Sequence, residues 1–367
     1  FLAAVAADDE GQLNEVRELL PSLLDAEAER FSPGQSQLLL RVLSQALESD
    51  PSLTAAFFGS GTFRAEMLRS MPEALPLLRQ ALALGLPEGE ERERIQVRVI
   101  TCLASMNQDE EVIREAREFL ALPIGPARRR IALLNLSFCL HRQGQKPDAY
   151  AAIEEAIQIA EETGFTYDAW QCRAQRAAML LIDTKFEDAA RELSEAVAYF
   201  QANRMALDPD RIVIQGNYGL ALGWLGRWEE ARVQLASALE EARVHRAKQT
   251  AGLVAGMLGW VLAHLGQREA AAKHFRFALR TSYRLEPNHA LVHLRYVAHA
   301  LRSSAPTEAN RIFTRNHILR EQASTPQMDV EAMLADGLSV LPGLPPVTLA
   351  EAIREAVATL NAWSSGP

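Results

Sequence analysis

The chain has 367 residues, a net charge of −9 and a hydrophobic content of 48%. This length allows two or three domains or one elongated array, and the hydrophobic share excludes a disordered chain. The acidic excess argues against a broad phosphate-binding surface, so we expect no direct nucleic-acid binding by this fragment. No apolar run reaches the roughly 18 residues of a membrane helix, so we expect no membrane span.

The N-terminal segment 1–30 has the pattern of a partial helical hairpin. The whole chain is rich in Ala, Leu, Glu and Arg, which predicts an all-α fold. Gly11 is followed five residues later by Val16 and twelve residues later by Leu23, a spacing that recurs in the helical hairpins predicted further along the chain. Phe1 is then expected to lie within a first helix whose beginning is missing. We therefore expect a fragment of a longer chain. The alternative is a signal-peptide remnant, because Ala-Val-Ala resembles a cleavage site, although no charged region precedes it.

Segment 31–92 is less regular and predicts irregular helical hairpins. The sequence FFGSGTF at 57–63 interrupts the helical pattern. Its glycine-rich part lacks the Lys and the spacing of a phosphate-binding loop, so we interpret it as a turn.

A regular array is predicted for 93–320. Three times, a Gly is followed five and twelve residues later by Ala, with a large apolar residue between the two alanines. The members are Gly144, Ala149, Ile153 and Ala156; Gly226, Ala231, Leu235 and Ala238; and Gly266, Ala271, Phe275 and Ala278. The Gly permits a positive φ at the end of one helix, and alanines seven apart share one face of the next. Such a hairpin must stack on neighbours to bury its apolar face.

These residues resemble tetratricopeptide (TPR) repeats, in which a Gly closes the first helix and a small residue opens the second. The family's small residue within the first helix is matched by Gly219 and Gly259, whereas Ile100 and Val297 depart from it. We call the first alanine position of the second helix the anchor. Its members are Val16, Ala74, Val112, Ala149, Ala189, Ala231, Ala271 and Ala309.

The later anchors recur about every 40 residues, longer than the roughly 34 of ordinary TPRs, and HEAT repeats are the rival interpretation. The TPR resemblance implies a right-handed superhelical solenoid of stacked antiparallel helix hairpins.

The C-terminal segment 321–367 predicts capping helices. A Pro/Gly-rich breaker spans 341–348, and Thr348 with Glu351 forms a capping box for a final helix. We expect that helix to cover the open end of the array.

A polar column appears fourteen residues before the anchors, within otherwise apolar first helices: Arg98, Asn135, Gln175, Asn217, Met257 and Arg295. The resemblance implies that this position faces a concave groove. There the amides would bond an extended peptide backbone, and Arg98 and Arg295 would hold carboxylates. Phe138 and Trp260 would make the groove partly hydrophobic. The alternative is that the amides bond neighbouring helices or water.

The function predicted from these residues is a peptide- or protein-binding scaffold, and the fragment is expected to be the regulatory or sensor part of a larger bacterial protein. The family's carboxylate clamp, with Lys and Asn at the fifth and ninth positions, is absent. One alternative is the inducer-binding sensor of an ATP-dependent transcription regulator of the maltose-activator class. Another is a peptide-pheromone receptor. We leave open a homodimer formed through an uncapped end.

Few residues have a pattern that points to catalysis or metal binding. The three cysteines lie far apart without CxxC spacing, which favours buried thiols and a cytoplasmic location. His289 and His293 are four apart but lack a third metal ligand, so we expect them to be solvated or groove-lining. His264 lies near a helix end, where a cation suits the helix dipole, and Trp224 and Trp228 are interpreted as packing residues. We expect no enzyme activity and no cofactor.

Overall fold

The computed structural model describes residues 71–83, 89–203, 209–285, 287–322 and 332–365. The hairpin predicted in 1–30 and the turn predicted at 57–63 lie outside these residues. Within them, every regular element is an α-helix, which confirms the all-α prediction. None of these described helices is long and apolar enough to cross a bilayer.

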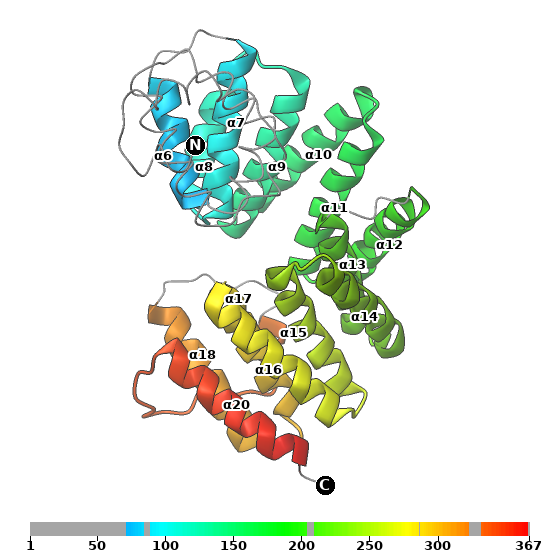
Figure 1. The fold of residues 1–367 in the computed structure, drawn as a ribbon, viewed down its shortest axis with the longest axis vertical. Coiled ribbons are helices and arrows are strands. Elements are labelled where there is room, and N and C mark those ends of the chain that lie inside the picture. Colours follow the sequence, from blue (N-terminus) through cyan, green and yellow to red (C-terminus); the bar gives the residue numbers. More distant parts are fainter. Residues whose placement is uncertain (1–70, 84–88, 204–208, 286, 323–331, 366–367) are drawn as a thin grey trace, which may run out of the picture. The chain divides into compact units, whose positions relative to one another are not determined.

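The helices alternate between first and second members of hairpins (Figure 1). The first helices are α7 (Glu90–Ser105), α9 (Pro126–Arg142), α11 (Thr166–Ile182), α13 (Pro209–Trp224), α15 (Lys248–His264) and α17 (Pro287–Leu301). The second helices are α8 (Asp109–Leu120), α10 (Lys146–Glu162), α12 (Phe186–Ala202), α14 (Trp228–Val244), α16 (Arg268–Leu285) and α18 (Pro306–Gln322). Helix α6 (Met71–Ala83) precedes the pairs, and α20 (Leu349–Ser365) follows them.

The chain divides into two compact units, 1–169 and 170–367. In the described part of the first unit, α7 packs against α6, α8 and α9, and α9 packs against α8 and α10. In the second unit, each second helix packs against the next first helix: α12 on α13, α14 on α15, and α16 on α17. The first helices α13, α15 and α17 also lie side by side. This stacking of helix pairs on their neighbours is TPR-like.

The turn within each of five hairpins has the same geometry. The residue five positions before the anchor has a positive φ, between 57° and 75°: Asn107, Gly144, Thr184, Gly226 and Gly266. The amide of the residue that follows bonds a carbonyl oxygen five positions back at 2.9–3.0 Å, as in a Schellman motif. The prediction of a left-handed glycine at this turn is confirmed, and Asn and Thr occupy the same conformation in two hairpins.

The anchors explain why the helices within a pair approach closely. All six anchors from Val112 to Ala309 are completely buried. A Cβ added to Gly219 would lie 2.6 Å from Leu235 Cγ, and one added to Gly259 would lie 2.9 Å from Phe275 Cδ1. In these two pairs, the large residue of the second helix therefore fills the space over the small residue of the first helix.

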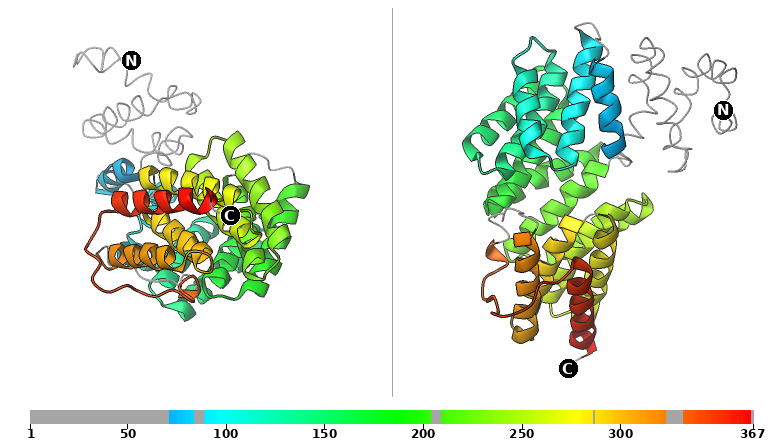
Figure 2. Two further views of the ribbon diagram at one scale, coloured as in Figure 1. Left: turned by 90° about the horizontal axis from the view of Figure 1, so that it is seen from below. Right: turned by 90° about the vertical axis from the view of Figure 1, so that its left-hand side faces the viewer.

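The C-terminal helix α20 closes the second unit beside α16 and α18 (Figure 2). The capping box is confirmed, since Thr348 N donates to Glu351 Oε2 at 2.8 Å and Glu351 N donates to Thr348 Oγ1 at 3.3 Å. Polar contacts fix the helix to both neighbours. Arg276 Nη1 donates to Asn361 Oδ1 at 2.8 Å, and Arg315 Nε donates to Glu355 Oε2 at 3.0 Å.

Candidate functional site

The predicted amide column lies on the first helices, and its side chains are half-buried. Asn135 donates from Nδ2 to the carbonyl oxygen of Ile131 at 2.9 Å and to Thr101 Oγ1 at 3.3 Å. The amides of Gln175 and Asn217 form no hydrogen bond to any residue that the structure describes. These two amides therefore have donors and acceptors available to a ligand, whereas the Asn135 donor is used within the first unit.

The two arginines of the column are buried instead of presented on the surface. Arg98 is 8% exposed and Arg295 is 2% exposed. Arg295 Nε donates to Asn316 Oδ1 at 2.8 Å, and Asn316 Nδ2 in turn donates to the carbonyl oxygen of Leu291 at 2.7 Å. Arg295 thus joins α17 to α18, so a carboxylate ligand would reach it only after rearrangement.

The two aromatic residues predicted for the groove lie in different units. Phe138 is half-buried in the first unit, and the Arg142 guanidinium lies 5.0 Å from its ring centroid. Trp260 is completely buried in the second unit. Trp260 belongs there to a larger cluster of rings that borders an open space.

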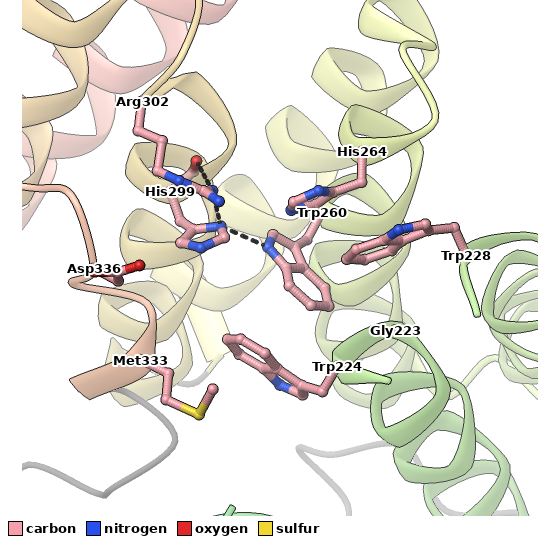
Figure 3. Close-up of a pocket in the computed structure, with 9 residues that line it drawn as sticks. All are labelled: Gly223, Trp224, Trp228, Trp260, His264, His299, Arg302, Met333 and Asp336. Atoms are coloured by element: carbon pink, nitrogen blue, oxygen red, sulfur yellow. Dashed lines mark hydrogen bonds between the residues drawn. The ribbon is translucent and has the colours of Figure 1, made fainter. Parts of the chain in front are cut away.

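That space is an open pocket of about 340 Å³, shown in Figure 3. We call it the tryptophan–histidine pocket. Its lining residues are Gly223 and Trp224 of α13, Trp228 of α14, Trp260 and His264 of α15, His299 of α17, Arg302 directly after α17, and Met333 and Asp336 from the segment before α20. Met333 and Asp336 lie on the side opposite Trp228.

Three lining residues occupy the same position within their repeats. Trp224, His264 and Arg302 each lie seven residues before an anchor and seven residues after a member of the polar column. Seven residues are about two helical turns, so both positions lie on the same face of a first helix. The pocket and the column therefore lie on one side of α13, α15 and α17. This second column was not predicted, although its spacing from the anchors is visible in the sequence.

The rings of the pocket pack against one another. The Trp224 and Trp260 centroids are 4.7 Å apart, and the Trp228 and His264 rings stack at 4.0 Å with an interplanar angle of 4°. Trp260 Nε1 donates to His299 Nδ1 at 2.9 Å, which fixes the orientation of both rings. Trp224 Nε1 is buried and has no hydrogen-bond partner among the described residues. The pocket thus combines a rigid aromatic wall with one unpaired indole donor.

The charge of the pocket comes from two residues. Burial and the nearby Arg302 lower the pKa of His264 to about 4 and that of His299 to about 3, so both histidines are neutral at neutral pH. The prediction of a cationic His264 at a helix end is therefore wrong, because desolvation outweighs the helix dipole. Arg302 and Asp336 remain as opposite charges, and no ion pair joins them or links them to another described residue.

Of the histidine pair His289 and His293, His293 lies in the core. His293 is completely buried above Gly256, and neither ring nitrogen bonds a described residue. Burial lowers its pKa to about 3. The prediction of a solvated or groove-lining side chain is wrong for His293, because its ring fills the space that a Cβ on Gly256 would need. No cluster of three metal-ligand side chains occurs in the described part of the chain.

The three cysteines are free and buried, as the sequence predicted. Burial raises the pKa of Cys102 to about 11 and that of Cys139 to about 12. A thiol with so high a pKa forms little thiolate at neutral pH, which argues against a nucleophilic role for either residue.

Solved structures resemble this chain, although no protein-family model and no curated protein matches it. A Rap protein in complex with competence and sporulation factor matches with a TM-score of 0.61 at 16% identity, over 98% of this chain and 96% of that chain. A signal-transduction ATPase with numerous domains (STAND) from Pyrococcus horikoshii, which has a TPR sensor, matches with a TM-score of 0.58 at 13% identity. That match covers 97% of this chain and 53% of the ATPase, so this chain spans about half of its length. At such identities the likenesses show the fold alone: the chain is a TPR-like array of stacked helix pairs.

Proposed function

We propose that the chain is a binding scaffold for a peptide or protein segment, which lies against the first helices of the second unit. The observation that carries the proposal is the co-location of unpaired polar groups and a pocket on one helix face. The amide of Asn217 has no described partner, and Trp224 of the pocket follows two turns later on the same helix. Unpaired amides suit the N–H and C=O groups of an extended backbone, and an aromatic pocket suits a side chain.

The fold supports this proposal and disfavours an enzyme. A Rap protein of similar fold was crystallised in complex with competence and sporulation factor. TPR-like arrays present extended surfaces to partners. The pocket's two histidines are neutral and hydrogen-bonded or stacked among rings, without a nucleophile beside them. Recognition of a partner therefore fits this chemistry better than catalysis.

A pool of random decapeptides tests the proposal. The immobilised chain is incubated with the pool, retained peptides are identified by mass spectrometry, and the best is resynthesised with a fluorescent label. The double variant Gln175→Ala with Asn217→Ala should weaken its binding by about 1–3 kcal/mol, roughly 5- to 150-fold in Kd.

The matched control is Gln158→Ala with Gln201→Ala, which removes two exposed amides from second helices. Kd should then stay within about twofold of wild type, because surface amides contribute little. Failure to retain any peptide would overturn the proposal. Equal loss in both double variants would refute the role of the first-helix face.

A second candidate function is the sensor part of a larger ATP-dependent regulator. The observation that favours it is the likeness to the STAND protein with a TPR sensor, of which this chain spans about half. A phosphate-binding loop encoded upstream of Phe1 in the gene would support this candidate. A DNA-binding module in that place would support a peptide-pheromone receptor instead.

A further inference from the structure

We infer that the tryptophan–histidine pocket is a specificity site that receives one aromatic side chain of the bound segment. This inference rests on the proposed peptide-binding function and adds which residue the scaffold selects. The size of the pocket, its wall, its charge and its place on the first helices support this inference.

The size of the pocket suits a single large side chain. Its volume of about 340 Å³ lies at the lower end of the roughly 300–1,000 Å³ typical of ligand sites. Three indole rings and Met333 are among its lining residues (Figure 3). Aromatic rings prefer stacked or edge-to-face neighbours, and a thioether packs well on a ring edge. An aromatic side chain therefore gains more here than an aliphatic side chain of similar area.

The wall is organised before any ligand binds. Trp260 is held by its hydrogen bond to His299, and Arg302 Nη1 donates to the His299 carbonyl oxygen at 2.8 Å. Trp228 is stacked on His264. Because these side chains are already fixed, a ligand need not order them, and less of the binding free energy is lost.

The two opposite charges of the pocket favour a neutral polar ligand over an ion. A polyanion would be attracted by a single arginine and repelled by the carboxylate of Asp336. A quaternary ammonium ligand, for which an aromatic cage is well suited, would be attracted by Asp336 and repelled by Arg302. A neutral group with both donors and acceptors meets neither penalty. A peptide residue is such a group, with Arg302 available to its carbonyl oxygen and Asp336 to its N–H.

Two further observations link the pocket to the column. The indole N–H of Trp224, a lining residue, is buried without a described partner, so a ligand acceptor would satisfy it once a shift of the side chain exposes that atom. Asn217 and Trp224 lie seven residues apart on α13, which is about 10 Å along the helix axis. Three residues of extended chain span that distance. One short segment can thus contact the Asn217 amide and place a side chain in the pocket.

The first test uses a single blocked residue, so it does not depend on a longer ligand. Protein labelled with ¹⁵N at its five tryptophans is titrated with N-acetylphenylalaninamide or N-acetylalaninamide, and the indole signals are followed by NMR. The phenylalanine compound should bind about tenfold more tightly or better and should shift the signals of Trp224, Trp228 and Trp260. Equal binding of the two compounds, or shifts confined to the other tryptophans, would overturn the inference.

Variants connect the binding to the pocket. Trp224→Leu should weaken binding of N-acetylphenylalaninamide about tenfold. Trp170→Leu is the matched control, because Trp170 is also half-buried and stacks on Tyr199 outside the pocket. Should Trp224→Leu fail to fold, as judged by circular dichroism, Arg302→Gln at the rim replaces it, with an expected loss of about threefold. Unchanged binding in the folded pocket variant would refute the inference.

The decapeptide pool then separates this inference from the proposed function. Enrichment of an aromatic residue among peptides retained by wild type, lost with Trp224→Leu but kept with Trp170→Leu, supports both. Retained peptides without aromatic enrichment overturn the inference and leave the scaffold proposal standing. Retention of no peptide overturns the scaffold proposal, and the blocked-residue titration then decides alone whether the pocket binds aromatic groups.

Discussion

Gly219→Ala is a sharp test of the close packing between α13 and α14. In an unconstrained helix this change stabilises by about 1 kcal/mol through helix propensity. Here the new Cβ would lie 2.6 Å from Leu235 Cγ and 3.3 Å from the carbonyl oxygen of Ala231. Overpacking of this kind costs about 1–3 kcal/mol, and the propensity gain offsets about 1 kcal/mol of it, so we expect a net loss of up to about 2 kcal/mol.

A double-mutant cycle identifies the cause of that loss. Leu235→Ala alone should destabilise by about 2–5 kcal/mol, because Leu235 is completely buried. In that background Gly219→Ala should become stabilising by several tenths of a kcal/mol, since the clash with Leu235 is gone, and only the milder contact with the Ala231 carbonyl oxygen still opposes the propensity gain. Urea unfolding followed by circular dichroism measures all four proteins. A stabilising Gly219→Ala in the wild-type background would refute the close-packing argument.

Three further predictions concern the turns, the core and the C-terminal cap. Thr184→Gly should raise the unfolding free energy by about 0.5–1 kcal/mol, because Thr184 has a φ of 61°. Gly226→Thr at the equivalent turn should lower the unfolding free energy, and thermal melts of the two variants compare the effects. His293→Leu should flatten the dependence of stability on pH. His293 has a folded pKa of about 3, below its unfolded value, so its contribution is complete above about pH 6.5 and falls by about 1.4 kcal/mol per unit below that. Urea titrations near pH 7 and pH 5 decide this, and an unchanged slope would contradict the burial argument. Thr348→Ala should cost about 1 kcal/mol and speed amide exchange within α20, whereas protection equal to wild type would show that the cap is dispensable.

The repeat architecture could be predicted from sequence because its determinants are local. A residue able to adopt positive φ, then a small anchor five positions later, specifies a turn and a buried face without reference to distant parts of the chain. Thr184 and Asn107 show the limit of that reasoning, because the turn forms without Gly where the flanking helices enforce it. The turn position of a hairpin therefore accepts residues other than Gly when both helices of that hairpin pack.

The candidate site was harder to predict because it depends on side-chain direction across several helices. Arg295 and Asn217 occupy the same register, yet one is buried against Asn316 and the other has no described partner. No single-helix pattern distinguishes them, since the difference arises from the residue that α18 presents to α17. Asp336 was also beyond prediction, because it lies in a turn between α18 and α20 that no repeat pattern covers.

The shared turn geometry determines where such a chain tolerates insertions and deletions. Within a hairpin, one extra residue between Gly226 and Ala231 would rotate every later position of α14 by about 100° and turn Ala231 away from α13. The connection between α14 and α15 repeats this turn, because Arg246 has a φ of 55° and Ala247 N donates to the Ala242 carbonyl oxygen at 2.8 Å, so an extra residue there would be equally disruptive. Residues 121–125 between α8 and α9 contain no residue with a positive φ, and an extra residue there would only lengthen the connection. Length variation in descendants of this sequence should therefore accumulate in connections of this second kind, where each helix pair remains intact.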